Sequence, residues 1–280
     1  MGIDTISSGV SIGFAIEAYE RGLLTKDDTG GIELKFGDPD LLVKLVEMIG
    51  KREGIGDFIA EGTKRMAEKL GNNASYFAIN SKGLEFPGYE TRGLKATGLS
   101  YATANRGGDH ISAYLPAPEG YGLALFGIGV GPTDPAKPSR EKAHLVATLE
   151  NLMEFMECAI FCKFLGFGLA TVEPVAKMAS KCIGIEMSVD ELFLYGERVW
   201  NLERCFNIRE GLTRKDDSLP ERCIKEPVPS GPAKGETNET HDQMLDWYYE
   251  KRGWDLQTGY PKREKLIALD LKEFADDLNL

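Results

Sequence analysis

Apolar residues recur at helical spacing along much of the chain. In the first quarter, the spacing predicts helices within residues 12–23, 41–49 and 58–70, the last of which ends at Gly71. Side chains three and four residues apart lie on one side of an α-helix, so each stripe marks a face that packs inward. The N-terminal part is therefore expected to be helical.

Capping signals mark three later helices. Ser139 is the expected N-cap of a long helix whose apolar stripe continues to Ile160. The sequences "SVDE" at 188–191 and "THDQ" at 240–243 have the form of capping boxes, in which the first side chain and the fourth satisfy each other's backbone N–H groups. Behind "SVDE", a regular stripe from Leu192 to Phe206 makes this the clearest helix.

Two regions lack helical periodicity. Residues 32–36 alternate apolar and charged side chains, which predicts a short strand or an extended arm. From about 76 to 133, glycine and proline recur, which predicts loops, and loops often carry functional sites. The fold class predicted from these patterns is mainly α, with few short strands.

Two cysteines lie at the end of the predicted helix 139–160. Cys158 and Cys162 are four residues apart and would share one helical face, which permits joint metal binding. Buried, inert thiols are the commoner outcome for such a pair. An iron–sulfur cluster usually needs four thiolates, and the cysteine spacing of this chain does not supply such a set.

His110 is the candidate among the three histidines. It ends the sequence "NRGGDH" inside the glycine-rich segment, where backbone approaches a ligand closely and an imidazole titrates near neutral pH. A structural loop histidine remains the alternative. His144 and His241 are expected to be solvated or capping side chains.

Composition and charge disfavour several classes of function for this chain. The 33 Lys and Arg residues against 44 Asp and Glu give a net charge of -11, which disfavours nucleic-acid binding. There is no signal-peptide pattern and no apolar run long enough to span a membrane. Five cysteines without a disulfide-like spacing favour reduced thiols, so we expect a cytoplasmic protein. Nucleotide loops and common nucleophile signatures are absent.

Five stretches of the sequence resemble the tungsten-pterin aldehyde ferredoxin oxidoreductase family. They run in family order from residue 2 almost to residue 275 and include "GIDTISSG", "REGIGDFIAEGTKRMAEKLG", "KGLEFPGYETRGLKATGLSYATANRGGDH", "GERVWNLERCFNIREGLTRKDDSLPERCIKEP" and "YYEKRGWDLQTGYPKREKL". The resemblance covers the family's C-terminal half. It implies that residues 1–79 end the middle helical domain and that residues 80–280 form the third helical domain.

The resemblance also implies roles for individual residues. In the family, two related motifs hold two pterins that chelate one tungsten beside a 4Fe-4S cluster. Gly2, Ile3, Asp4 and Thr5 match the end of the first motif, and residues 157–163 lie where the second belongs, with Glu157 in place of the usual Asp and Ile160-Phe161 in place of Gly-Leu. Glu157 and Phe161 would then belong to the cofactor site, Cys162 would be the fourth cluster ligand, and His110 would lie near the tungsten.

Three functions follow from this resemblance. The first is the C-terminal part of an enzyme that oxidises aldehydes to carboxylic acids and passes electrons to ferredoxin. The second is a relative with another substrate, such as an aromatic thioester. The third is a truncated or split helical module that binds no cofactor and needs a separately encoded N-terminal half. The family's cluster-binding triplet lies before Met1, so we expect the isolated chain to be inactive, and a homodimer is a further expectation.

Overall fold

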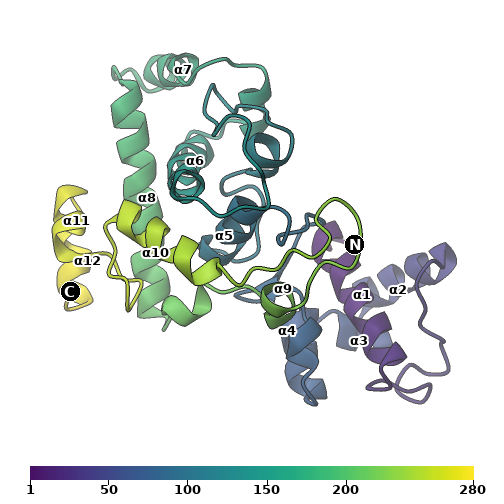
Figure 1. Cartoon of the computed structure of the whole chain (residues 1–280). Helices are drawn as coiled ribbons and strands as arrows, with labels where there is room; N and C mark the ends of the chain where they lie inside the picture. The colour runs from purple at the N-terminus through teal and green to yellow at the C-terminus, as the bar shows by residue number, and fades with distance from the viewer.

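The computed structural model describes residues 1–280 and confirms a mainly α-helical fold (Figure 1). Its two strands, β1 (Asn80–Ser81) and β2 (Leu84–Glu85), form one short antiparallel hairpin. All other regular elements are helices. None of them combines the length and the apolar character that a membrane span requires.

The first helices form a lobe of their own, which we call the N-terminal lobe (Figure 1, purple to blue). A separate core of 17 buried residues, from Ile12 to Ala78, holds it together. Two of its helices begin at aspartate caps: Asp4 accepts the Ser7 N–H at 2.6 Å, and Asp38 accepts the Leu41 N–H at 3.0 Å. The lobe consists of α1 (Thr5–Glu20), α2 (Pro39–Lys51), α3 (Ile55–Ile59), α4 (Gly62–Leu70) and η1 (Ala74–Phe77).

The predicted helix 58–70 is broken into α3 and α4. The break places Gly62 at a φ of 79°, and a side chain there would lie 2.9 Å from Glu85 Oε1. That carboxylate accepts the Thr63 N–H at 2.7 Å and the Thr63 hydroxyl at 3.0 Å, so β2 caps the start of α4. The ending at Gly71 is confirmed.

Of the two structures predicted for residues 32–36, the strand is absent, and the segment is an arm without regular structure. Leu34 is buried in the core of the N-terminal lobe, while Phe36 is 58% exposed, and the segment forms no ladder. No neighbouring strand is available to accept its backbone hydrogen bonds, so the alternation reflects an irregular chain that touches the core at one point.

A second, larger core of 28 buried residues lies between α5 (Lys95–Thr103), α6 (Arg140–Cys158), α8 (Val189–Arg209) and α10 (His241–Arg252). Figure 1 shows α6 and α10 beside the long α8, with α7 (Glu173–Ile183) at one end of it. Gly196 permits the close approach of α8 to α6, because a side chain there would collide with the Asn151 carbonyl.

The capping signals are confirmed at two of three places. Ser139 accepts the Lys142 N–H at 3.2 Å, and Ser188 forms the full capping box with Glu191. At α10 the box is wrong, because the Thr240 side chain makes no cap. His241 is also not a solvated or capping residue: it is buried, with Nε2 3.0 Å from the Asp217 carbonyl oxygen.

A buried ion network ties the hairpin to α8. Asp217 accepts from Arg204 Nη2 at 2.7 Å and from Lys82 Nζ at 2.9 Å, and all three side chains are nearly inaccessible. At the surface, Arg222 also pairs with Glu17 of α1 at 2.8 Å. These contacts join the N-terminal lobe to the rest, and the domain division between residues 79 and 80 stays a prediction.

Short helices complete the chain and end it far from the N-terminus (Figure 1). They are η2 (Pro116–Gly120), η3 (Lys163–Phe167), η4 (Arg214–Asp216), α9 (Glu221–Lys225), α11 (Arg263–Ala268) and α12 (Lys272–Asp277).

Candidate functional site

The loop "NRGGDH", residues 105–110, is tied to the segment that follows α6. Arg106 Nη2 lies 2.8 Å from Asp109 Oδ2 and 3.1 Å from Glu157 Oε1. Lys163 completes the link, because its Nζ lies 2.7 Å from the same Glu157 oxygen and donates to the Ile111 carbonyl at 3.1 Å. The structure therefore brings two segments that are 50 residues apart in sequence to one corner, which we call the loop–helix corner.

Ionisation at this corner is set by burial and by the paired charges. Partial burial acts to raise the pKa of Glu157, but Lys163 and Arg106 outweigh it, and the pKa is lowered. The same competition lowers the pKa of Asp109, which accepts the Ile111 N–H and also faces Arg106. Both carboxylates are therefore ionised at neutral pH.

His110 lies in this corner among aromatic rings. Its ring centroid is 6.1 Å from that of Tyr89 and 6.0 Å from that of Tyr114, and its side chain is 20% exposed. Burial lowers the pKa of His110, although Asp109, with Oδ1 4.0 Å from Nδ1, acts to raise it. A neutral imidazole at the protein surface can accept a proton, as a general base requires.

The predicted helix through residue 160 ends at Cys158. Ile160 has a φ of 58° and is 91% exposed, so it does not face the core as its stripe position suggests. Cys162 follows in an extended conformation (φ -66°, ψ 121°) and is exposed. Cys158 and Cys162 therefore do not share a helical face, and the expectation of a buried Cys158 is wrong, because its thiol is exposed as well.

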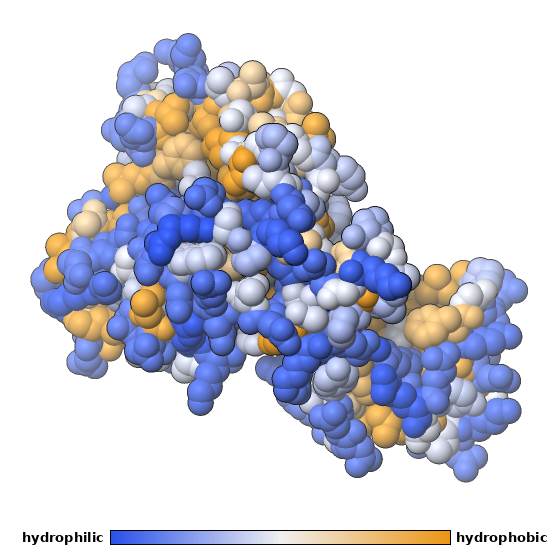
Figure 2. Space-filling model, in the orientation of Figure 1, coloured by the Kyte–Doolittle hydropathy of each residue, from blue (hydrophilic) through white to orange (hydrophobic).

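Phe161, between these residues, is half-buried against the larger core. On the other side of Cys162, Phe164 is 55% exposed and Phe167 is 48% exposed, and both rings contact Tyr114 edge-on. Figure 2 shows further apolar surface in the upper part of the molecule, near α7. Cys162 thus lies next to exposed aromatic side chains.

Asp4 lies in a different place. It lines an open, largely polar cavity of about 600 Å³ together with Ile3, Ser7, Lys64 and Arg65. Gly2, close to Asp4 in the chain, has a φ of 70° and open space around it. Thr5, which follows Asp4, is exposed. The β1–β2 hairpin stands between the two places: Lys82 and Gly83 line the cavity, and the Ser81 carbonyl accepts the Gly108 N–H at 3.3 Å.

The residues of this chain are of the types that could hold a pterin and supply one ligand to a cluster. Only one Asp4 oxygen is engaged in the protein, with the Ser7 N–H, which leaves the other free to accept from a pterin N–H group. The same cavity holds Lys64 and Arg65 as well as Glu61, Glu68 and Glu85, so its lining offers both charged donors and charged acceptors. Cys162 is accessible to a cluster, but the structure brings no three His, Cys, Asp or Glu side chains together as a metal site. The remaining ligands of a cluster would have to come from outside this chain.

The backbone after α6 also suits the second pterin motif. The family's motif has Gly at the position of Ile160, and here the chain adopts the left-handed conformation that glycine favours, although it carries a β-branched residue. A glycine at this position would adopt the observed conformation without strain.

Comparison with known proteins identifies the family. A sequence model described as aldehyde ferredoxin oxidoreductase, domains 2 and 3, matches residues 1–271. The chain belongs to this family. The tungsten-containing aldehyde ferredoxin oxidoreductase of Pyrococcus horikoshii is 40% identical over 279 residues, which cover 98% of this chain and 44% of the relative. The chain thus spans less than half the length of its curated aldehyde ferredoxin oxidoreductase relatives.

Other similar proteins are named for different substrates. The WOR-like subunit of an aliphatic sulfonate oxidoreductase from Pyrococcus furiosus is 34% identical over 291 residues, covering 98% of this chain and 41% of that protein. Among solved structures, the active-site complex BamBC of benzoyl coenzyme A reductase in complex with 1,5-dienoyl-CoA matches with a TM-score of 0.78 and 25% identity, covering 99% of this chain and 45% of that one. Proteins named for different substrates are therefore similar to this chain in sequence or in fold.

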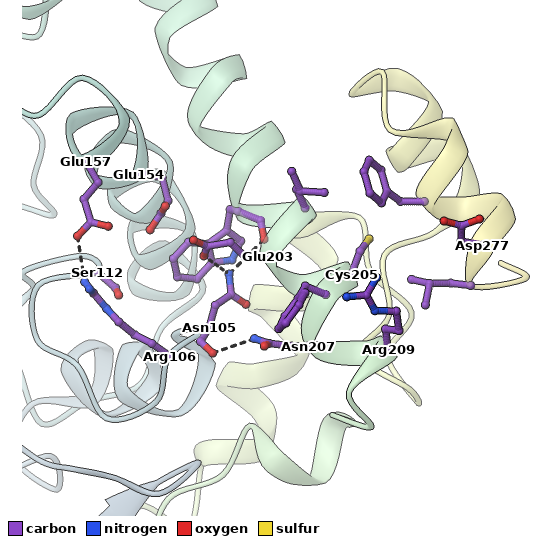
Figure 3. A pocket seen from close by; sticks show the side chains of 15 residues that line it. Asn105, Arg106, Ser112, Glu154, Glu157, Glu203, Cys205, Asn207, Arg209 and Asp277 are labelled. Atoms are coloured by element: carbon purple, nitrogen blue, oxygen red, sulfur yellow. Dashed lines mark hydrogen bonds and ion pairs between the residues drawn. The ribbon is translucent and has the colours of Figure 1, made fainter.

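Several side chains of the site were not singled out from the sequence. Arg106 and Asp109 lie inside "NRGGDH", so the glycine-rich signal that marked His110 also points to them. Glu154 and Glu203, which line a pocket beside the loop–helix corner, gave no signal, because an isolated glutamate on a helix usually faces solvent (Figure 3).

Proposed function

We propose that the chain is the pterin-facing and cluster-facing part of a tungsten-dependent oxidoreductase that converts aldehydes to carboxylic acids. One aldehyde and one water give one acid, two protons and two electrons, and ferredoxin is the proposed electron acceptor. The observation that carries the proposal is the loop–helix corner, where ion pairs hold the segment of His110 against the segment of Glu157 and Cys162. The redox chemistry is supplied by the tungsten cofactor and the 4Fe-4S cluster when they are bound.

The residues of this chain have distinct proposed tasks. Asp4 and Glu157 accept hydrogen bonds from the pterins, flanked by Gly2, Ile3, Thr5 and Phe161, and Cys162 supplies one thiolate to the cluster. His110, neutral because burial lowers its pKa, takes up a proton as water adds to the aldehyde carbonyl. Tyr89 and Tyr114 hold the imidazole between their rings.

Metal analysis tests the cluster assignment. The chain is co-expressed anaerobically with the N-terminal region of the family, and iron and tungsten are measured in the purified complex. We expect Cys162→Ser to lose iron while Cys158→Ser retains it. Since both thiols are exposed and only four residues apart, the second variant controls for a general effect of removing a thiol. Iron retained by Cys162→Ser would refute the ligand assignment.

Activity tests the role of His110. We expect the complex to oxidise an aldehyde to its acid with reduction of ferredoxin, and His110→Asn to lower kcat by about 10²–10⁴-fold, the contribution typical of a general base. The iron and tungsten content of that variant should equal that of the wild type. The chain purified alone should hold no cluster, so stoichiometric iron and tungsten in it would contradict the proposal.

Reduction of the ring of an aromatic thioester, with two electrons from reduced ferredoxin and two protons, is the second candidate activity. It is favoured by the aromatic cluster in which Tyr89 and Tyr114 lie next to His110 and Tyr114 contacts Phe164 and Phe167, together with the likeness to a benzoyl coenzyme A reductase complex. Aromatic rings pack well against such a cluster. The complex is assayed with benzoyl-CoA and reduced ferredoxin, and separately with benzaldehyde and oxidised ferredoxin, at equal substrate concentrations. A higher kcat/KM for benzoyl-CoA would favour this candidate over aldehyde oxidation.

A further inference from the structure

A pocket of about 500 Å³ lies between the end of α6, α8 and α12 (Figure 3). One part of its lining is apolar and comes from Leu202, Phe206, Phe274 and Leu278. The other part is polar and includes Asn105, Glu154 and Glu203. A short amphipathic ligand matches this division.

Glu154 is the unusual side chain of this pocket. It is 4% exposed, and no hydrogen bond or ion pair engages its carboxyl group within the protein. Glu157, one helical turn later, instead pairs with Lys163 and Arg106. Buried carboxyl groups without a partner are costly, so Glu154 needs either a proton or a ligand that donates hydrogen bonds.

Glu203 supplies a second acceptor in the lining, and Asn105 fixes its position. Asn105 Nδ2 donates to the Trp200 carbonyl at 3.1 Å and to Glu203 Oε2 at 3.0 Å, which fixes the orientation of the amide. Its Oδ1 is consequently left buried without a partner. The second oxygen of Glu203 accepts no hydrogen bond within the protein.

The donors near Glu154 and Glu203 are already engaged, whereas Arg209 lies at the exposed side of the pocket and makes no hydrogen bond. Arg106 pairs with Asp109 and Glu157, and Asn207 Nδ2 donates to the Asn105 carbonyl at 2.8 Å. Arg209 lies over the Phe206 ring, 5.0 Å from its centroid, with Nε 3.6 Å from Glu210. At the buried end of the pocket, around Glu154 and Glu203, the open hydrogen-bonding capacity therefore consists of acceptors, and a ligand has to bring the donors there.

We propose that this pocket binds a primary ammonium group carried on a short apolar chain or ring. The N–H donors of an ammonium match the free oxygens of Glu154 and Glu203. The apolar wall from α8 and α12 receives the rest of the ligand. These acceptors do not form a group of three His, Cys, Asp or Glu side chains suited to a metal ion. This assignment stands independently of the aldehyde chemistry proposed above.

Binding should depend on pH in a defined direction. The charged groups that act on Glu154 are Glu203 on α8, Glu157 on α6, Lys163 on η3 and Arg106 on the loop after α5. Burial and the two carboxylates raise the pKa of Glu154 to about 8, so it carries a proton at neutral pH, which a bound ammonium would displace. Below pH 8, affinity should therefore rise up to about tenfold per pH unit, with one proton released per ligand.

Calorimetric titration of the 280-residue chain with n-butylammonium chloride tests the proposal. We expect a Kd on the order of 0.1–1 mM at pH 8, about what five heavy atoms provide in a good pocket, and weaker binding at pH 7 and pH 6. Two buffers with different ionisation enthalpies report the released proton. Butyrate, which is negatively charged, and 1-butanol, which is uncharged, have the same chain length as n-butylammonium. We expect neither to bind measurably.

Glu154→Gln is the decisive variant, because it keeps the shape and removes the charge. It should weaken n-butylammonium binding at least tenfold at pH 8 and abolish proton release. Glu47→Gln, the same change at a carboxylate on α2 that is 54% exposed, should leave both unchanged. Equal binding of butyrate or butanol, no binding at 10-fold the expected Kd, or full affinity in Glu154→Gln would each overturn the proposal. If Glu154→Gln fails to fold, the pH series and the probe comparison on the wild-type chain still decide it.

Discussion

Replacing Ile160 should stabilise the protein. Its φ of 58° is the left-handed conformation, where the side chain of an L-residue crowds the following carbonyl, at a cost of about 1–2 kcal/mol. Branching at Cβ makes isoleucine one of the poorest residues for this region. Because the side chain is 91% exposed, its removal gives up almost no hydrophobic burial.

Ile160→Asn isolates the backbone contribution. Asparagine tolerates the left-handed region through local hydrogen bonds and, unlike glycine, adds little freedom to the unfolded chain. We therefore expect the free energy of unfolding to rise by about 1 kcal/mol and the Tm by about 2 °C. Ile160→Gly should gain less, because glycine adds about 0.4–1 kcal/mol of unfolded-state entropy that folding must overcome.

Thermal unfolding followed by circular dichroism and calorimetry provides the measurement, with two controls. Ile160→Val keeps the branched Cβ and should leave Tm unchanged. Ile185→Asn makes the same polar change at an isoleucine that is 65% exposed and does not have positive φ, so it should give no gain. A Tm of Ile160→Asn at or below that of the wild type would refute the backbone argument, and an equal gain in Ile185→Asn would assign the effect to surface polarity instead.

Three further changes test the packing and the buried charges. Gly196→Ala should lower the free energy of unfolding by several kcal/mol in denaturant titrations, because the new Cβ would stand 1.7 Å from the Asn151 carbonyl oxygen unless α8 moves away from α6. Asp217→Asn should cost about 3–5 kcal/mol in the same assay, because it leaves Arg204 buried without its counter-charge. Glu154 has its pKa raised from 4.5 to about 8, first by burial, so its stabilising contribution is full below pH 4.5 and is lost as pH rises through 8. Glu154→Gln should abolish that loss and exceed wild-type stability at pH 9 by about 2–4 kcal/mol, and identical pH profiles would contradict it.

Amphipathic helices could be predicted from the sequence, and fully buried ones could not. The helix α8 has one apolar stripe and a capping box, so both its start and its inward face followed from pattern. In α5, by contrast, all nine residues are buried, including Lys95. Since no face of α5 meets water, polar and apolar residues do not alternate with helical period, and the segment was expected to be loop.

The end of α6 shows why the thiol pair was misplaced. The apolar stripe continues past Cys158 to Ile160, and the spacing alone therefore extends the helix. What ends it is the left-handed turn at Ile160, which satisfies the last carbonyls through the N–H groups of Ile160 and Phe161. Such turns are usually marked by glycine or asparagine, and isoleucine gives no such signal.

Local sequence patterns also do not predict contacts between residues that are far apart in the chain. "NRGGDH" attracted attention for its glycines, and Gly107 and Gly108 are indeed required, because a Cβ at either would collide with the β1–β2 hairpin. That Arg106 reaches Glu157, 51 residues away, depends on the packing of the loop against α6 and could not be derived from either segment. The same holds for Glu154, whose burial is decided by α8.

The ion pairs of the loop–helix corner explain how an exposed cysteine can still be held in place. Cys162 makes no cap hydrogen bond of its own, yet the residues on both sides of it are fixed. Glu157, with one methylene more than the aspartate usual at this position of the family motif, reaches both Arg106 and Lys163. Lys163, directly after the thiol, is in turn anchored to the Ile111 carbonyl. The longer side chain therefore ties the Cys162 segment to the loop of His110 and leaves Cys162 exposed.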